Sequence, residues 1–229
     1  MASTLNTKRS LVLCDGDLPS MVALSLTQDA VGGVADVDVL SAPVVSSAGE
    51  VVAAHVRQFA EAQAAECLDF PAVTPNSLTS GARRNRYLSE AAQHASSNGY
   101  AVLVCPWLAE RFDPESSGDC HTPPGVDALA RELDRALLVS RLVTLDASEH
   151  GASVFEVQAP LMDLTDAQVA EMALDLDVPI WRTWWWEHAS AKRAKDAGLA
   201  ARAQALRNRW CTALETLGWS PGIEASAER

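Results

Sequence analysis

The sequence has few cysteines, and none of them form a recognised metal-binding or disulfide pattern. The five cysteines are Cys14, Cys67, Cys105, Cys120 and Cys211, and no two of them form a C-x-x-C pair. An odd number without paired spacing argues against a disulfide framework and against a zinc site built from cysteine alone.

Long apolar runs are also absent. No segment reaches the ~18 apolar residues that a membrane-spanning helix needs. Residues 1–9 lack the apolar stretch of a secretory signal. We therefore expect a cytoplasmic protein.

Basic residues are scarce relative to acidic ones. There are 18 Lys and Arg against 30 Asp and Glu, which gives a net charge of −12 and an isoelectric point near 4.8. Such a surface repels phosphate backbones, so general binding of nucleic acid is not expected. A small anionic ligand would need a local basic pocket.

Short apolar runs alternate with helical patterns along the 229 residues. The sequence predicts one α/β domain over residues 1–219 and a disordered tail over 220–229. Strands are expected at 11–14, 36–40, 67–70, 100–105 and 153–157. Helices are expected at 21–26, 49–66, 85–96, 126–145, 166–176, and from Trp186 to about 217, with long loops at 71–83 and 112–124. This alternation is typical of a Rossmann-like, doubly wound parallel sheet, with a helical segment at its C-terminal end.

Two helix ends carry local signals. Asn98-Gly99 is typical of a helix C-terminus, where glycine takes a left-handed backbone conformation. Thr165 followed by Gln168 has the spacing of a capping box at a helix start.

Four segments stand in an order that resembles one family. They are Asp15–Ser20 after the first strand, Gly81–Leu88, Ser117–His121, and Ala159–Val169. Together they resemble the ATP-dependent 7-cyano-7-deazaguanine synthases, which belong to the PP-loop ATP pyrophosphatases. The likeness spans roughly residues 11–217.

The resemblance implies particular site residues. In the family's Ser-Gly-Gly-x-Asp-Ser loop, which cradles ATP phosphates, only Gly16 and Ser20 match, while Asp15 and Asp17 replace other residues. The implied ligand-binding positions are Arg84, Asn85, Asp119, Cys120 and His121, the last standing where the family has arginine. The resemblance also implies an adenine nucleotide alpha hydrolase-like fold and a possible homodimer.

The substitutions oppose the family's chemistry, in which MgATP activates a carboxylate that becomes a nitrile. Asp15 and Asp17 would face the phosphates, and Asp166 stands where the family has a lysine. One such pair of charges at ~4 Å costs about 4 kcal/mol at an effective dielectric of 20. We therefore predict that ATP does not bind in the family manner.

Two interpretations of the acidic loop stay open. Asp15 and Asp17 could cap the following helix in an Asx turn. Alternatively, they could hold a relocated Mg²⁺ that serves ATP. The family's structural zinc is not expected, because Cys211 and His188 supply too few ligands.

The remaining candidates also have alternatives. Arg84, with Arg83 and Arg86, could bind an anion or pair with surface carboxylates. Trp181 and Trp184–Trp186 could stack on a planar ligand, fill the volume of the lost zinc module, or form a subunit interface. His55, His94 and His150 occur singly and are interpreted as ordinary structural or solvated residues.

The sequence therefore predicts a divergent synthase-like protein that binds a purine-like or carboxylate ligand without ATP-driven nitrile formation, in effect a pseudoenzyme. The alternatives are an active ATP-dependent ligase that uses the relocated Mg²⁺, and a structural protein that dimerises through its tryptophans.

Overall fold

The computed structural model of the chain describes residues 9–33, 36–42, 49–70, 80–106, 121, 123–148, 154–189 and 197–220. Within these ranges, five strands form one parallel sheet in the order β3-β2-β1-β4-β5. The strands are β1 (Ser10–Cys14), β2 (Val37–Ser41), β3 (Cys67–Asp69), β4 (Val102–Val104) and β5 (Glu156–Gln158). This topology confirms the predicted doubly wound α/β fold.

The central strand β1 is buried along its whole length. A parallel sheet is covered on both faces, so a central strand needs apolar side chains at successive positions. Val12 lies in register with Val39 of β2 and with Val104 of β4. Leu11 and Leu13 point to the opposite face.

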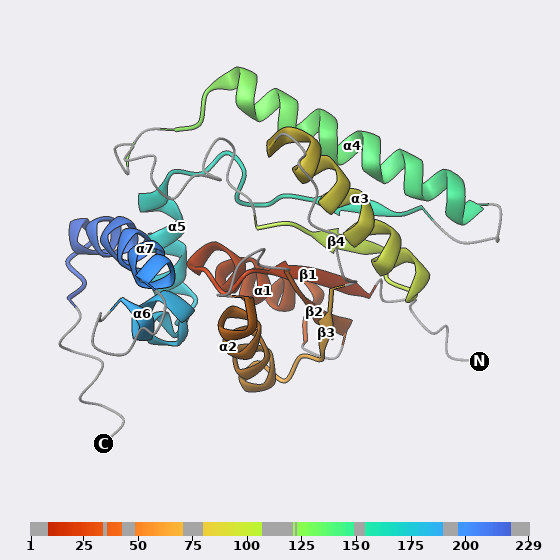
Figure 1. The fold of residues 1–229 in the computed structure, drawn as a ribbon. Helices are drawn as coiled ribbons and strands as arrows, with labels where there is room; N and C mark the ends of the chain where they lie inside the picture. The colour runs from red at the N-terminus through yellow and green to blue at the C-terminus, as the bar shows by residue number, and fades with distance from the viewer. Residues whose placement is uncertain are drawn as a thin grey trace.

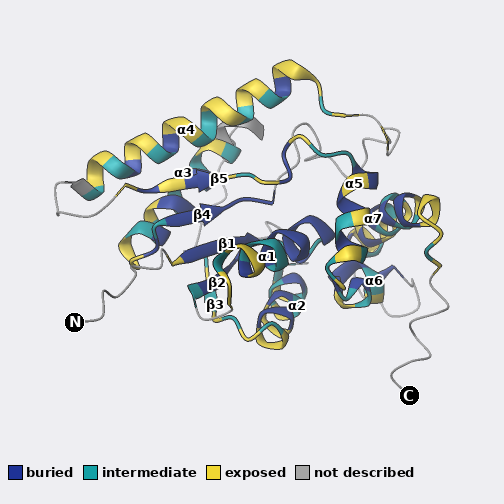
Figure 2. Ribbon diagram, turned by 180° about the vertical axis from the view of Figure 1, so that it is seen from behind, coloured by how far each residue is buried: buried dark blue, intermediate teal, exposed yellow. Residues whose placement is uncertain are grey.

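The helices divide between the two faces of the sheet (Figure 1). Helices α1 (Leu18–Val31) and α2 (Gly49–Ala62) cover one face, and α3 (Ser80–Ser97) and α4 (Val126–Ser148) cover the other. Each face has its own apolar cluster, because side chains alternate along every strand. Figure 2 shows the buried strands between these two helical layers.

The C-terminal helices pack beside α1. They are α5 (Asp166–Asp175), the short α6 (Trp184–His188) and α7 (Ala197–Thr216), with a 3₁₀ turn η2 (Ile180–Arg182) before α6. Helix α1 contacts α5, and α6 contacts both α2 and α7. This arrangement places α6 and α7 over the loop that follows β1.

Two local predictions are confirmed. Gly99 takes the left-handed conformation with φ +80°, and the Tyr100 backbone N–H after it donates to Ala95 O. The Thr165 and Gln168 side chains bond reciprocally to each other's backbone N–H groups, which forms the predicted capping box.

Several element bounds differ from prediction, and two of these differences bear on the site. Helix α3 begins at Ser80, inside the predicted loop, because small residues of low helix propensity are tolerated in a first turn. Trp184–Trp186 do not lead into a long helix. They form α6 themselves, and α7 is a separate helix that begins at Ala197.

Candidate functional site

The loop after β1 is a tight turn held by carboxylate side chains. The Asp15 Oδ1 atom accepts hydrogen bonds from the Asp17 backbone N–H and from the Ser20 hydroxyl, both at 3.1 Å. Asp17 is the N-cap of α1, and its side chain accepts from Leu18 N. The structure thus has the helix-capping arrangement that was one of the two alternatives for this loop.

Two tryptophans donate to the same carboxylate. The indole Nε1–H groups of Trp185 in α6 and Trp210 in α7 both lie 2.8 Å from Asp17 Oδ1. Leu18 N is also 2.8 Å from that atom. One oxygen therefore accepts three N–H groups at the N-terminus of α1, where a helix binds anions most readily.

The space over the loop is filled by α6. Gly16 has φ +73°, and a Cβ at this position would lie 3.1 Å from Trp184 Cδ1. The Trp184 backbone N–H reaches Gly16 O at 3.4 Å. Trp184 and Trp185 are buried, so these two side chains fill space inside the protein.

Burial favours the neutral form of the Asp17 carboxyl group. Removal from water and the neighbouring Asp15 carboxylate raise the pKa of Asp17 to about 6, against opposing effects of Arg209 and the hydrogen bonds from Leu18 and Trp185. The group still ionises below neutral pH. It then places a negative charge at the positive end of α1.

Asp166, which stands where the resembled family has a lysine, is paired with an arginine in the structure. Arg209 of α7 binds both Asp166 oxygens, with Nε to Oδ2 and Nη2 to Oδ1 each at 2.8 Å. The two side chains are mostly buried. A cation from a distant helix neutralises the charge, so Asp166 gives no repulsion toward a nucleotide.

Arg84 and Asn85 lie at the start of α3 and face α4. The Arg84 Nη1 donates to Glu132, and Glu132 also accepts from Arg135 Nη1. Arg135 Nε donates to the Asn85 side-chain oxygen. These contacts join the two helices, as in the ion-pair alternative for this arginine.

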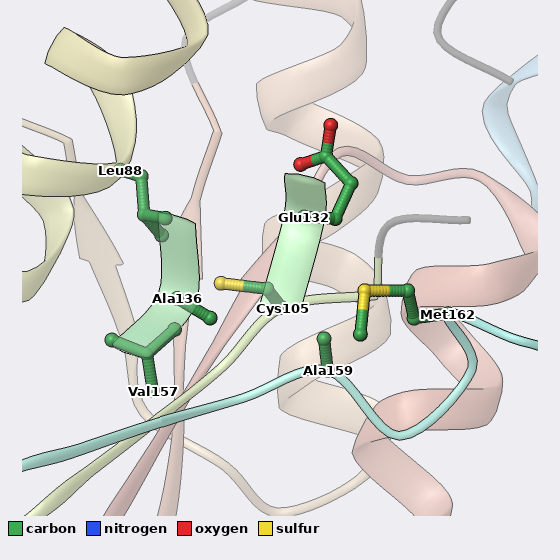
Figure 3. Close-up of a pocket in the computed structure, with 7 residues that line it drawn as sticks. All are labelled: Leu88, Cys105, Glu132, Ala136, Val157, Ala159 and Met162. Carbon is green, nitrogen blue, oxygen red and sulfur yellow. The ribbon is translucent and has the colours of Figure 1, made fainter. Parts of the chain in front are cut away.

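A small cavity lies between α3, α4 and the ends of β4 and β5 (Figure 3). Its volume is about 20 Å³, enough for roughly one water molecule. The lining residues are Leu88, Cys105, Glu132, Ala136, Val157, Ala159 and Met162. Burial raises the pKa of the Cys105 thiol well above its ordinary range, which leaves it an unreactive thiol.

Of the segment Ser117–His121, which carries part of the family resemblance, the structure describes only His121. Asp119 and Cys120 lie outside the described residues, and His121 is exposed. The ligand contacts expected of these three residues stay predictions.

The sequence did not reveal a cluster of histidines. His55 of α2 lies beside Glu187 and His188 of α6, with their ligand atoms all within 4.8 Å of one another. The two histidines are distant in sequence: His55 was interpreted alone, and His188 was considered only with Cys211 as a zinc ligand. Only the packing of α2 on α6 brings them together.

No family model matches the chain, and no curated protein matches it. The resemblance to the 7-cyano-7-deazaguanine synthases therefore stays a prediction. Among solved structures, the chain is similar to the U34-tRNA thiolase NcsA from Methanococcus maripaludis, determined with its [4Fe-4S] cluster. That match has 11% identity and a TM-score of 0.46, and it covers 95% of this chain and 74% of that one.

Within the described ranges, none of the helices combines the length and apolar character that crossing a bilayer would require.

Proposed function

We propose that this chain is a non-catalytic relative of the PP-loop enzymes, in which the anion site at the N-terminus of α1 is occupied by the protein's own carboxylate. The observation that carries the proposal is the Asp17 oxygen bound by Leu18 N and by the indoles of Trp185 and Trp210. A phosphate at this position would have to displace the carboxylate and both indole contacts.

Both packing and charge oppose the binding of a phosphate at this position. The turn at Gly16 has Trp184 directly above it, so a phosphate could approach only if α6 moved. The ionised Asp17 would also repel each phosphate oxygen that came close. The alternative of Mg²⁺ held by Asp15 and Asp17 gains no support, because Asp17 Oδ1 already accepts three hydrogen bonds.

We further propose that a purine-like or carboxylate ligand binds outside the carboxyl ends of β1 and β4. The strand order reverses between these two strands, and ligands of open α/β sheets bind at such a reversal. The family resemblance implies that Asp119, Cys120 and His121 take part in holding this ligand. The described cavity beside β4 is too small for a purine.

Titration calorimetry with MgATP tests the first proposal. The full chain should give no heat of binding at millimolar nucleotide, and it should release neither pyrophosphate nor AMP. Binding with micromolar affinity and turnover would show that the α1 terminus is open and would overturn the proposal.

Thermal shift with 7-carboxy-7-deazaguanine and guanine tests the second. A raised melting temperature that is lost in Asp119→Asn but kept in Asp163→Asn, a control outside the implied ligand-binding positions, would support a ligand contact by Asp119. The absence of any shift would refute the ligand while leaving the first proposal standing.

A further inference from the structure

His55, Glu187 and His188 form a cluster of metal-ligand side chains away from the β1–α1 loop. The Nε2 of His55 lies 3.9 Å from Glu187 Oε2, and the two imidazole rings pack edge to face at 5.3 Å. The His55 side chain is largely enclosed, whereas Glu187 is more than half exposed. The cluster is therefore open to solvent on one side.

The hydrogen bonding of His188 suits a metal ligand. Its Nδ1 lies 2.9 Å from Trp184 O. A carbonyl oxygen can only accept, so Nδ1 is the donor, and in the neutral imidazole Nε2 is then the nitrogen with the lone pair. Histidine ligands commonly donate their second ring nitrogen to a carbonyl or carboxylate in this way.

The charge of the protein also favours a cation at this cluster. Its net charge of −12 attracts cations.

We propose that His55, Glu187 and His188 bind a zinc-type divalent metal ion. Two imidazoles and one carboxylate make a common three-ligand zinc set, in which the fourth position is left to water. Ligand atoms around tetrahedral zinc lie ~3.4 Å apart, so the side chains need only small rotations from their present separations. The site differs from the cysteine site of the resembled family in residue type.

The ion would link α2 to α6, because His55 lies in α2 and the other two ligands lie in α6. Helix α6 carries Trp184 and Trp185, which cover the β1–α1 loop. A metal that binds the folded chain and not the unfolded one stabilises it by mass action. This proposal does not depend on whether nucleotide binds.

Calorimetric titration of the EDTA-treated full chain with ZnCl₂ tests the site. We expect one ion per chain, and at least about tenfold weaker binding in His55→Ala, His188→Ala and Glu187→Gln. His94→Ala, which removes an imidazole from α3, is the matched control and should bind like the wild type. Glu187 is exposed, so its variant is expected to fold even if a histidine variant does not.

Co²⁺ provides a second readout. A tetrahedral cobalt spectrum that is present in the wild type and lost in Glu187→Gln supports the site. Equal zinc affinity in wild type and His55→Ala, or loss of binding only in Cys211→Ser, would overturn it.

A separate surface lies on the outer side of α4 (Figure 2). Five leucines of this helix are exposed by 47% or more: Leu133, Leu137, Leu138, Leu142 and Leu145. Between them lie Asp134 and Arg141, both exposed, two helical turns apart on the same side. We name these seven residues the α4 face.

We infer that the α4 face binds a second copy of this chain with its helix antiparallel. A two-fold axis between Leu137 and Leu138 would place Leu133 against Leu142 of the partner copy. The same axis would place Asp134 against Arg141 of the partner copy, and because of the symmetry this ion pair would occur two times in the interface. The face is therefore complementary to itself in both apolar surface and charge, as a two-fold interface requires.

Light scattering after gel filtration tests this interface. The wild type should elute as a dimer, and Asp134→Arg should elute as a monomer because it juxtaposes like charges. The double variant Asp134→Arg with Arg141→Asp should restore the dimer, while Leu217→Glu, an exposed leucine elsewhere, should leave it unchanged. A monomeric wild type, or a dimer that persists in Leu138→Glu, would refute the interface.

Discussion

The charge of Asp17 can be tested through the pH dependence of stability. The structure raises the pKa of this carboxyl from 3.8 to about 6, chiefly through burial. An acid whose pKa is raised on folding stabilises the protein when protonated. That stabilisation is fully present below pH ~4 and is lost as pH rises to ~6. The difference between the two pKa values corresponds to about 3 kcal/mol.

Asp17→Asn removes this titration and keeps the shape of the side chain. The amide oxygen can still accept from Leu18 N and from the two indoles, so any change in hydrogen bonding should add a constant offset at every pH. We expect the stability of the variant relative to the wild type to rise by up to about 3 kcal/mol between pH 4 and pH 7.

Urea unfolding followed by tryptophan fluorescence measures both proteins at several pH values. Carboxyl groups remote from Asp17 titrate equally in the two proteins and cancel in the difference, whereas Asp15 interacts with the Asp17 charge and belongs to the same pH trend. Asp163→Asn, which removes a carboxylate from an exposed turn residue, is the control and should show no such trend. A difference that stays constant from pH 4 to pH 7, or that falls, would refute the view that Asp17 is a buried charge.

The remaining predictions concern stability in urea. Arg209→Ala should cost about 3–5 kcal/mol because it leaves Asp166 buried without a partner, whereas replacing both by Leu and Met should cost far less; an equal loss in the two variants would contradict this reasoning. Gly16→Ala should cost about 2 kcal/mol, because alanine disfavours φ +73° and its Cβ would press on Trp184; an unchanged urea midpoint would show that α6 yields easily. Thr165→Ala should cost about 1 kcal/mol through loss of the capping box, and Thr165→Ser should recover most of that stability.

The sequence predicted the sheet because its signals are local. The apolar strand at Leu11–Cys14 and the helix signals at Gly99 and Thr165 each depend on neighbouring residues, and each was found in the structure. The strand lengths were less certain, since pairing with a neighbour sets where a strand ends. Thus Tyr100 and Cys105 lie outside β4 although both belong to the same apolar run.

The site was less predictable because its partners are far apart in the chain. Nothing near Asp17 indicates that Trp185 and Trp210 will donate to it. The ion pair of Asp166 was not predicted because its partner, Arg209, lies 43 residues away. In both cases, helices from the C-terminal part of the described chain, α6 and α7, supply the partner groups.

The hydrogen bond from Trp210 to Asp17 spans 193 residues, which has a consequence for synthesis. Helix α1 obtains its final cap from α7, which is synthesised long after it. Until α7 emerges, the start of α1 stays open, and the nascent chain lacks the contacts that close it. Fragments that end before α7 should therefore be unable to complete even their earliest β-α unit.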